Sequence, residues 1–312
     1  MAQTIALVLV VLLAACRPAA DSAAANNRTP TSVPDSTAPT SGRPTSPATD
    51  TVATTAPAAR ATDAGGSPSQ SLPPTTTPRP AWLGVRTIPT NAAGDGLPME
   101  TPPELINRRF ATIDTLPPPT PDDLFDPTWV TLDQVPDVLE RSTWVEGCPV
   151  PPEDLAYITV PFWGFDGLVH TGELIVHQDV AADVISVFET LYGERFPIEE
   201  MRIVTQADVD APPIGDGNNS GGFVCRPITG GSGFSEHAKG LAVDINPFHN
   251  PYVKDDRVLP EQATFYTDRS LDLPGMIGPD SIVVSAFADI GWSWGGDWDS
   301  LVDYQHFSAT GR

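Results

Sequence analysis

A long tract without apolar periodicity limits the part of this chain that can fold. Residues 17–80 consist mainly of Ser, Thr, Ala and Pro. Such a composition buries too little apolar surface to offset the loss of chain entropy, so we expect a disordered tether. As a flexible coil it would span roughly 40–50 Å, and its prolines would extend it further. A compact domain must therefore come from residues 81–312.

An apolar run, Ile5–Ala15, precedes the tether. It is too short to cross a bilayer as a stable helix, which needs about 20 residues, but it suits the central part of a secretory signal. No Lys or Arg precedes it, although signal peptides normally begin with basic residues. Leu13-Ala14-Ala15-Cys16 resembles the lipobox of bacterial lipoproteins, which implies cleavage before Cys16 and a lipid on that residue. We expect an exported chain anchored at the outer face of the cytoplasmic membrane; the alternative is an ordinary signal peptide with an incidental Cys16.

The negative charge of the chain lies outside the tether. The net charge is −23, and residues 17–80 hold five Arg and four Asp, which leaves −24 on residues 81–312. Nucleic acid and anionic lipid headgroups should repel such a domain. We therefore expect no nucleic-acid partner and no membrane contact except through the lipid anchor. We also expect a monomer.

Residues 81–147 are rich in proline with scattered aromatic residues, and we expect an irregular arm there. Regular patterns begin near Leu155. They predict two strands within 154–176 with a turn at Asp166-Gly167, a helix from the cap Asp179 to Gly193, a strand over 198–205, and a second helix ending at Gly291. This order predicts an α+β domain over residues 148–312, with a small, mostly antiparallel sheet and two main helices.

Two cysteines, Cys148 and Cys225, remain once Cys16 is assigned to lipid. In an exported protein an even pair is a candidate disulfide. Metal binding by these two is disfavoured, because neither lies in a CxxC pair.

The stretch Ser235–Asp244, SEHAKGLAVD, places a histidine and a carboxylate close together. We expect Leu241–Ile245 to be a strand whose Leu, Val and Ile side chains face the core, so that Asp244 points to the other face. His237 precedes Gly240, which lets the chain turn back. The imidazole and the carboxylate could then meet at one point, as two ligands of a zinc ion.

A catalytic zinc ion usually has three protein ligands and one open position. His306, near the C-terminus, can complete the set, and Asp303 lies three residues before it. Zinc lowers the pKa of water toward about 7, and the Asp303 carboxylate could accept the proton.

Ser235-x-His237-x-x-Gly240-x-Ala242-x-Asp244, followed by Asp303-x-x-His306, resembles the paired signature of the D-alanyl-D-alanine carboxypeptidase metallopeptidases. These include VanY-type carboxypeptidases and L-alanyl-D-glutamate endopeptidases, and their fold is similar to that of the hedgehog signalling domain. The similarity covers roughly residues 148–312. Stretches such as CRPITG, DINPFHNPYV and GWSWGGDW resemble one bacterial branch of the family. It implies zinc held by His237, Asp244 and His306, and a catalytic carboxylate at Asp303.

Members of this family also use an arginine upstream of the first motif. Arg226 is the best candidate, and its guanidinium could stabilise the oxyanion formed when a peptide carbonyl is attacked. The alternative is that Arg226 pairs with a surface carboxylate.

The resemblance implies a zinc peptidase that cuts peptidoglycan stem peptides in the cell wall, most simply as a carboxypeptidase that releases terminal D-Ala. The alternatives are an L-Ala–D-Glu endopeptidase, a zinc-containing wall-binding module without turnover, and a structural lipoprotein that spaces the wall. The complete ligand set together with Asp303 favours an enzyme, since a binding module needs no base.

Other polar and aromatic residues receive structural interpretations. We expect Ser235 to cap its turn, His249 to be a loop residue outside the metal site, and His170 and His177 to be solvated. Trp292, Trp294 and Trp298 could line a groove, with at least one of them in the core.

Overall fold

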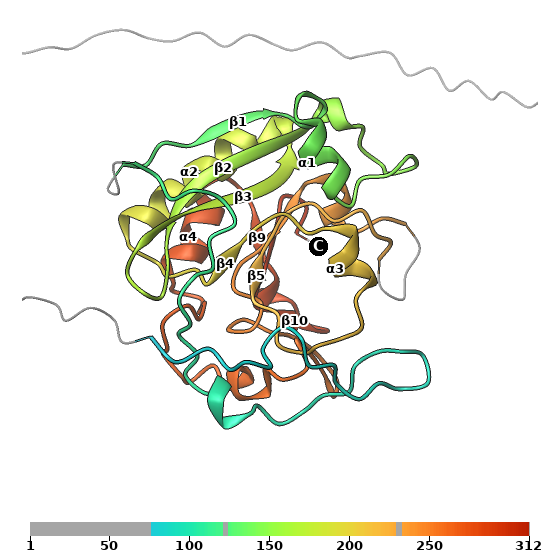
Figure 1. The fold of residues 1–312 in the computed structure, drawn as a ribbon, viewed down its shortest axis with the longest axis vertical. Coiled ribbons are helices and arrows are strands. Elements are labelled where there is room, and N and C mark those ends of the chain that lie inside the picture. The colour runs from blue at the N-terminus through green and yellow to red at the C-terminus, as the bar shows by residue number, and fades with distance from the viewer. Residues whose placement is uncertain (1–75, 121–123, 229–232, 312) are drawn as a thin grey trace, which may run out of the picture. The chain divides into compact units, whose positions relative to one another are not determined.

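The computed structural model describes residues 76–120, 124–228 and 233–311 (Figure 1). These residues form an α+β fold with few helices and small sheets, whose strands are mostly antiparallel. The predicted fold class is confirmed. The lipobox with Cys16 and almost all of the predicted tether lie outside the described residues.

A long hairpin forms the largest sheet. β2 (Leu155–Trp163) pairs antiparallel with β3 (Val169–His177), and β1 (Thr128–Thr131) adds to the free edge of β2. Gly167 has a φ of +75° in the connecting loop, a conformation that glycine adopts without strain. The predicted strands and turn are thus confirmed.

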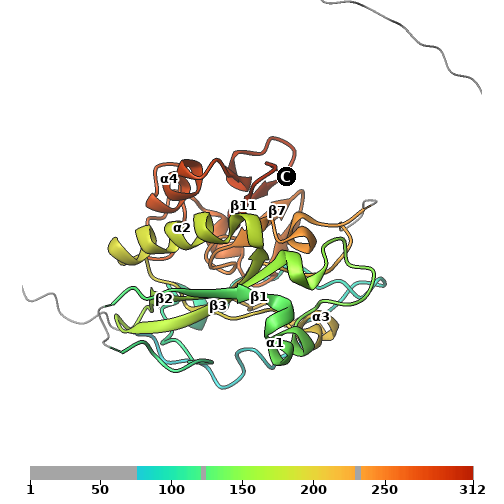
Figure 2. The ribbon, with the colours of Figure 1, turned by 90° about the horizontal axis from the view of Figure 1, so that it is seen from above.

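One main helix covers this sheet and the other packs on the first. α2 (Ala181–Gly193) buries Val184, Val187, Phe188 and Leu191. α4 (Ile282–Asp289) packs on α2, and Figure 2 shows α2 between the sheet and α4. Both predicted helices are confirmed, and Gly291, just beyond α4, has the left-handed conformation (φ +79°) typical of a helix end.

The predicted cap of α2 is wrong. A 3-10 turn over Gln178–Val180 precedes the helix, and its cap is His177, whose Nδ1 accepts a hydrogen bond from the Asp179 N–H at 3.2 Å. The helix therefore begins later than the sequence suggested, because this turn occupies the residues expected to start it.

Two small sheets carry the C-terminal half. One has the order β6-β11-β9, with β6 (Ala242–Asp244), β11 (His306–Ser308) and β9 (Ser293–Trp294). The other has the order β10-β7-β8, with β10 (Val302–Asp303), β7 (Tyr252–Lys254) and β8 (Arg257–Leu259). Val243 and Phe307 are fully buried, and Phe307 stacks on Phe287 of α4 with ring centroids 4.1 Å apart.

The predicted strand over residues 198–205 is much shorter in the structure. Only β4 (Glu200–Met201) forms, and it pairs parallel with β5 (Asn219–Ser220). Thr205 instead caps α3 (Gln206–Asp210), since Thr205 and Asp208 form a reciprocal capping box. The local cap ends the extended conformation.

The arm over 81–147 is more ordered than predicted. It contains β1 and α1 (Pro136–Arg141), with 3-10 turns at Pro103–Leu105 and Leu132–Gln134. Most side chains of β1 are exposed, so the strand lacks the apolar alternation that would reveal it in the sequence. Further upstream, Leu105 and Phe110 are fully buried in a cluster with Phe248 and Tyr266.

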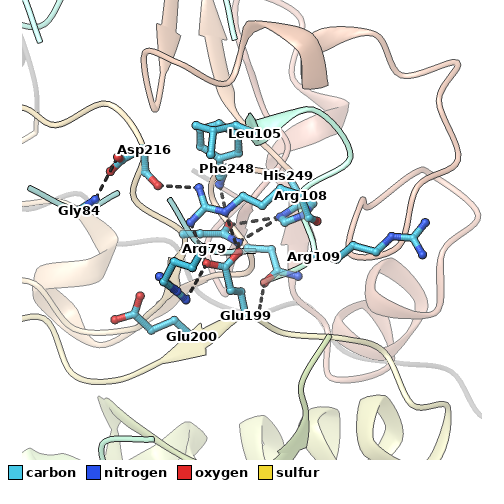
Figure 3. Close-up of polar contacts among 12 residues, drawn as sticks. Arg79, Gly84, Leu105, Arg108, Arg109, Glu199, Glu200, Asp216, Phe248 and His249 are labelled. Atoms are coloured by element: carbon cyan, nitrogen blue, oxygen red, sulfur yellow. Dashed lines mark hydrogen bonds and ion pairs between the residues drawn. The ribbon is translucent and has the colours of Figure 1, made fainter. Parts of the chain in front are cut away.

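A buried ion pair joins the arm to the rest of the fold (Figure 3). Arg108 donates from Nε and Nη2 to the two carboxylate oxygens of Glu199, each at 2.7 Å, and from Nη1 to the backbone oxygen of Asp216 at 2.7 Å. The Glu199 side chain is 0% exposed and that of Arg108 is 3% exposed. Burial alone would raise the pKa of Glu199, but Arg108 lowers it below its usual value.

His249 belongs to this same buried network. Its Nε2 donates to the backbone oxygen of Arg108 at 3.0 Å, and its Nδ1 lies 3.1 Å from the side-chain nitrogen of Asn218. Burial lowers the pKa of His249 to about 4, so the ring is neutral at pH 7. His249 is not part of the group of His237, Asp244 and His306 that could hold a metal ion, as expected.

The expectation that His170 is solvated is wrong. Its side chain is buried, with Nδ1 2.7 Å from Asp114 and Nε2 3.1 Å from Asp166. Asp114 belongs to the arm, so the packing of a distant segment hides a histidine that the local sequence left exposed. His177 is half-buried.

Cys148 and Cys225 form a disulfide that links residues 77 positions apart. Across the described ranges, no helix combines the length and apolarity needed to cross a membrane.

Candidate metal centre

The turn Glu236–Lys239 holds His237 by a cap at each end. Ser235 accepts a hydrogen bond from the His237 N–H at 3.4 Å, as expected of the capping residue. Gly240 ends the turn with φ +69°, in the left-handed region that favours glycine. Its Cα also lies against the backbone of Val176 and His177, where a Cβ would collide.

We expect Gly240→Ala to lower the free energy of unfolding by at least about 1–3 kcal/mol, because alanine is strained at this φ and would push β3 away. Urea unfolding followed by circular dichroism measures the change. Gly193→Ala is the matched control: Gly193 ends α2, its φ is not positive, and a Cβ there meets nothing. Equal stability of the two variants would contradict the conclusion that the backbone at position 240 requires glycine.

Asp244 and His306 meet through strand register. β6 and β11 pair antiparallel, with His306 directly opposite Asp244 and Phe307 opposite Val243. Paired residues point to the same face of a sheet, so one register sends Val243 and Phe307 to the core and the two polar side chains to the other face. The predicted inward positions of Val243 and Ile245 are confirmed; Leu241 is only half-buried, and Ala242 is fully buried.

Three donor atoms from these segments form a compact triangle. His237 Nε2 and His306 Nδ1 lie 3.2 Å apart, His306 Nδ1 and Asp244 Oδ1 3.0 Å, and His237 Nε2 and Asp244 Oδ1 3.3 Å. A tetrahedral zinc ion with bonds of 2.0–2.2 Å separates its ligand atoms by roughly 3.3–3.5 Å. The nitrogen and oxygen donors and their spacing therefore fit such an ion, and the cluster could hold a metal.

A backbone carbonyl fixes the orientation of the first histidine. His237 Nδ1 donates to the Gly222 oxygen at 2.7 Å, which leaves Nε2 as the lone-pair donor toward the cluster. The adjacent Gly221 forms both backbone hydrogen bonds with Asp244, at 2.9 and 3.0 Å. The sequence analysis did not predict that Gly221 and Gly222 hold Asp244 and His237 in place. The two adjacent glycines were the only feature of the sequence that pointed to this loop.

The electrostatics of the cluster favour an ionised Asp244. Burial alone would raise the pKa of this carboxyl, but His237 and His306 outweigh it and the pKa lies below its ordinary value. An anionic oxygen beside two imidazoles is suited to a divalent cation.

Asp303 lies near these three side chains, and one of its carboxylate oxygens lacks a hydrogen-bond partner among the described residues. It is directly opposite Tyr252 in the β10–β7 pair. Its Oδ1 is buried and has no hydrogen-bond partner in the described part of the chain. Burial, and then the nearby charge of Asp244, raise the pKa of Asp303 to about 6. Gly295 permits this arrangement, because a Cβ there would lie 3.0 Å from the Cβ of Asp303 and 3.3 Å from that of His306.

These residues open into a cleft of about 1300 Å³. Its walls include the metal cluster, Asp303, Trp298 and Arg226. Arg226 is half-buried in the segment that bridges back on itself through Pro227 and Phe234. Trp292 and Trp294 are buried in the core, whereas Trp298 faces the cleft, so the tryptophans divide between the two expected roles.

Comparison with known proteins gives one family match, over residues that include the candidate metal ligands. Residues 229–309 match a protein-family model described as D-alanyl-D-alanine carboxypeptidase. No significant match was found among curated proteins or among solved structures. The matched segment contains His237, Asp244, Asp303 and His306. The match supports the assignment of this segment to the D-alanyl-D-alanine carboxypeptidase family of peptidases.

Proposed function

We propose that this protein is a zinc-dependent peptidase that hydrolyses amide bonds in the stem peptides of peptidoglycan. The observation that carries the proposal is the triangle of ligand atoms from His237, Asp244 and His306, near Asp303, a half-buried residue whose Oδ1 is buried, in an open cleft. The donor set has three members, which is the number typical of catalytic zinc, whereas structural zinc sites usually have four, often including cysteine.

The chemistry divides between the ion and the side chains. A zinc ion in this cluster would supply Lewis acidity toward water and toward the amide carbonyl. Asp303 would accept a proton from the attacking water as the water oxygen bonds to the carbonyl carbon. It would return that proton to the nitrogen as the carbon–nitrogen bond breaks. The products are a free carboxylate and a free amine.

Arg226 has a supporting role in this proposal. From the cleft wall its guanidinium would stabilise the negative charge that develops on the carbonyl oxygen. Its position on the cleft wall supports this role over that of an arginine engaged only with the outer surface.

Release of terminal D-Ala is the preferred reaction, because it is the reaction in the description of the matching family model. An L-Ala–D-Glu endopeptidase is the second candidate, since the same chemistry would cut either amide. A zinc-containing binding module is the third, but it would not need the half-buried carboxylate of Asp303 beside the three candidate ligands. We also propose a monomer, exported and held by a lipid on Cys16, with the tether carrying the domain into the wall.

Digestion of purified muropeptides, read by mass spectrometry, tests the function. The wild-type protein with zinc should release D-Ala, whereas a chelated sample and His306→Ala should release nothing. Metal analysis should find one zinc ion per wild-type chain and a much lower content in His306→Ala. Binding of muropeptides without cleavage would instead favour the binding module, and cleavage by the chelated sample would refute the zinc dependence.

A further inference from the structure

One face of the β10-β7-β8 sheet forms part of the cleft. In register, Asp303 is opposite Tyr252, Tyr252 is opposite Leu259, and Lys254 is opposite Arg257. Directly paired residues share a face, as do residues two apart on one strand. All five of these residues line the cleft. The sheet therefore presents the candidate base and a pair of basic side chains on the same surface.

The basic pair lies a short step from the candidate base. Lys254 is two residues beyond Tyr252 along β7, which is about 7 Å at the rise of a strand. Arg257 extends the positive patch onto β8. A group within about two residues of the scissile amide of an extended peptide would come within reach of these side chains.

The distribution of charge sets this cleft apart from the rest of the protein. The chain has 17 basic and 40 acidic residues, and Lys239 and Lys254 are its only lysines. Both line the cleft, together with Arg226 and Arg257, so that the lining includes four basic and five acidic residues. A dication would shift this balance further toward positive charge. The cleft lining is thus much less acidic than the chain as a whole, and its basic residues could attract an anionic group.

The two lysines differ in how they are engaged. Lys239 Nζ lies 2.6 Å from the Glu236 carboxylate. The Lys254 side chain is exposed and makes no ion pair or hydrogen bond with its described surroundings. Arg257 has a long contact of 3.7 Å with the partly exposed Asp95, and exposed pairs of this kind contribute little. Lys254 and Arg257 are therefore available to a ligand.

We infer that Lys254 and Arg257 form a subsite for a carboxylate on the leaving side of the scissile amide. The inference rests on the proposed function: Asp303 returns a proton to the departing amine, so the leaving residue must pass over the sheet face that bears Asp303 and the basic pair. Both candidate substrates carry the required group there. Terminal D-Ala has its α-carboxylate, and D-Glu linked through its side chain has a free α-carboxylate.

Calorimetric binding to the zinc-loaded Asp303→Asn protein tests the subsite without turnover. One pair of probes is an N-acetylated tripeptide ending in D-Ala-D-Ala, as the free acid and as the C-terminal amide. The other pair contains an L-Ala–D-Glu bond, with the D-Glu α-carboxylate free or amidated. We expect the free acid of the true substrate class to bind about 10–100-fold more tightly than its amide, the range for a hydrogen bond to a charged group.

Substitutions then locate the preference. Lys254→Met should reduce it to within about threefold, and Lys254→Arg should preserve it. Lys239→Met is the matched control, a lysine in the same cleft that is already paired, and should leave the preference unchanged. Equal binding of acid and amide, or a preference that survives Lys254→Met, would overturn the subsite alone. Failure of all four probes to bind would overturn the stem-peptide assignment together with the subsite.

Discussion

Asp303→Asn should lower kcat for stem-peptide hydrolysis by about 10²–10⁴-fold, the usual contribution of general acid–base catalysis, while zinc content stays at one ion per chain. The amide is similar in size to the carboxylate but cannot accept the proton from water. Release of D-Ala measures the rate, and metal analysis of the same sample measures the zinc.

The matched control for this substitution is Asp297→Asn, because Asp297 lines the same cleft but is exposed. Its rate should remain within about threefold of wild type, as a surface carboxylate outside the proposed machinery supplies no proton transfer. Full activity of Asp303→Asn would remove Asp303 from the mechanism. Loss of zinc along with activity would show instead that Asp303 positions the metal ligands.

Arg108→Met should lower the free energy of unfolding by about 3–5 kcal/mol, because it leaves the Glu199 carboxylate buried without its counter-charge. Thermal and urea unfolding measure the loss. Arg202→Met is the comparison: this arginine pairs with Glu200 and Asp208 at partly exposed positions, where about 1 kcal/mol or less is expected. The double variant Arg108→Met, Glu199→Leu should recover part of the loss. Equal effects of the two arginine substitutions would contradict the argument from burial.

The same ion pair predicts how stability depends on pH. Arg108 lowers the pKa of Glu199 in the folded state, so the contribution of the pair is fully present above the unfolded pKa of Glu, about 4.3. It is lost as pH falls through the lower, folded pKa. The stability difference between wild type and Arg108→Met should therefore shrink in acid, and unfolding curves at several pH values measure this.

The elements that the sequence predicted correctly are those with local periodicity. The β2–β3 hairpin and α2 each extend over at least nine residues with a regular apolar pattern, and a turn or end signal bounds them. β1 was missed because its side chains are mostly exposed, and the strand over 198–205 was overestimated because a capping box begins a helix inside it. Local patterns do not report such tertiary and capping effects.

The candidate site also has a part that the sequence predicted and a part that it did not. The spacing of the two motifs singled out His237, Asp244, Asp303 and His306, which the fold brings together at one cleft. The support from Gly222 and the placement of Lys254 beside Arg257 depend on contacts between segments distant in the chain or on the register of short strands, which sequence spacing does not determine. The burial of His170 was missed for the same reason, since its partner Asp114 lies 56 residues away in the arm.

The pairing of His306 with Asp244 on neighbouring strands has a consequence for the lifetime of the protein. An ion bound by Asp244 of β6 and His306 of β11 would bind the paired strands far more tightly than the separated ones. It would therefore stabilise the pairing of β6 with β11. A ligand at 100 times its dissociation constant adds about 2.7 kcal/mol to native stability. At the proposed zinc site, scarcity of the ion would then loosen the segment that also carries the buried Phe307, and resistance to proteolysis would follow the supply of zinc.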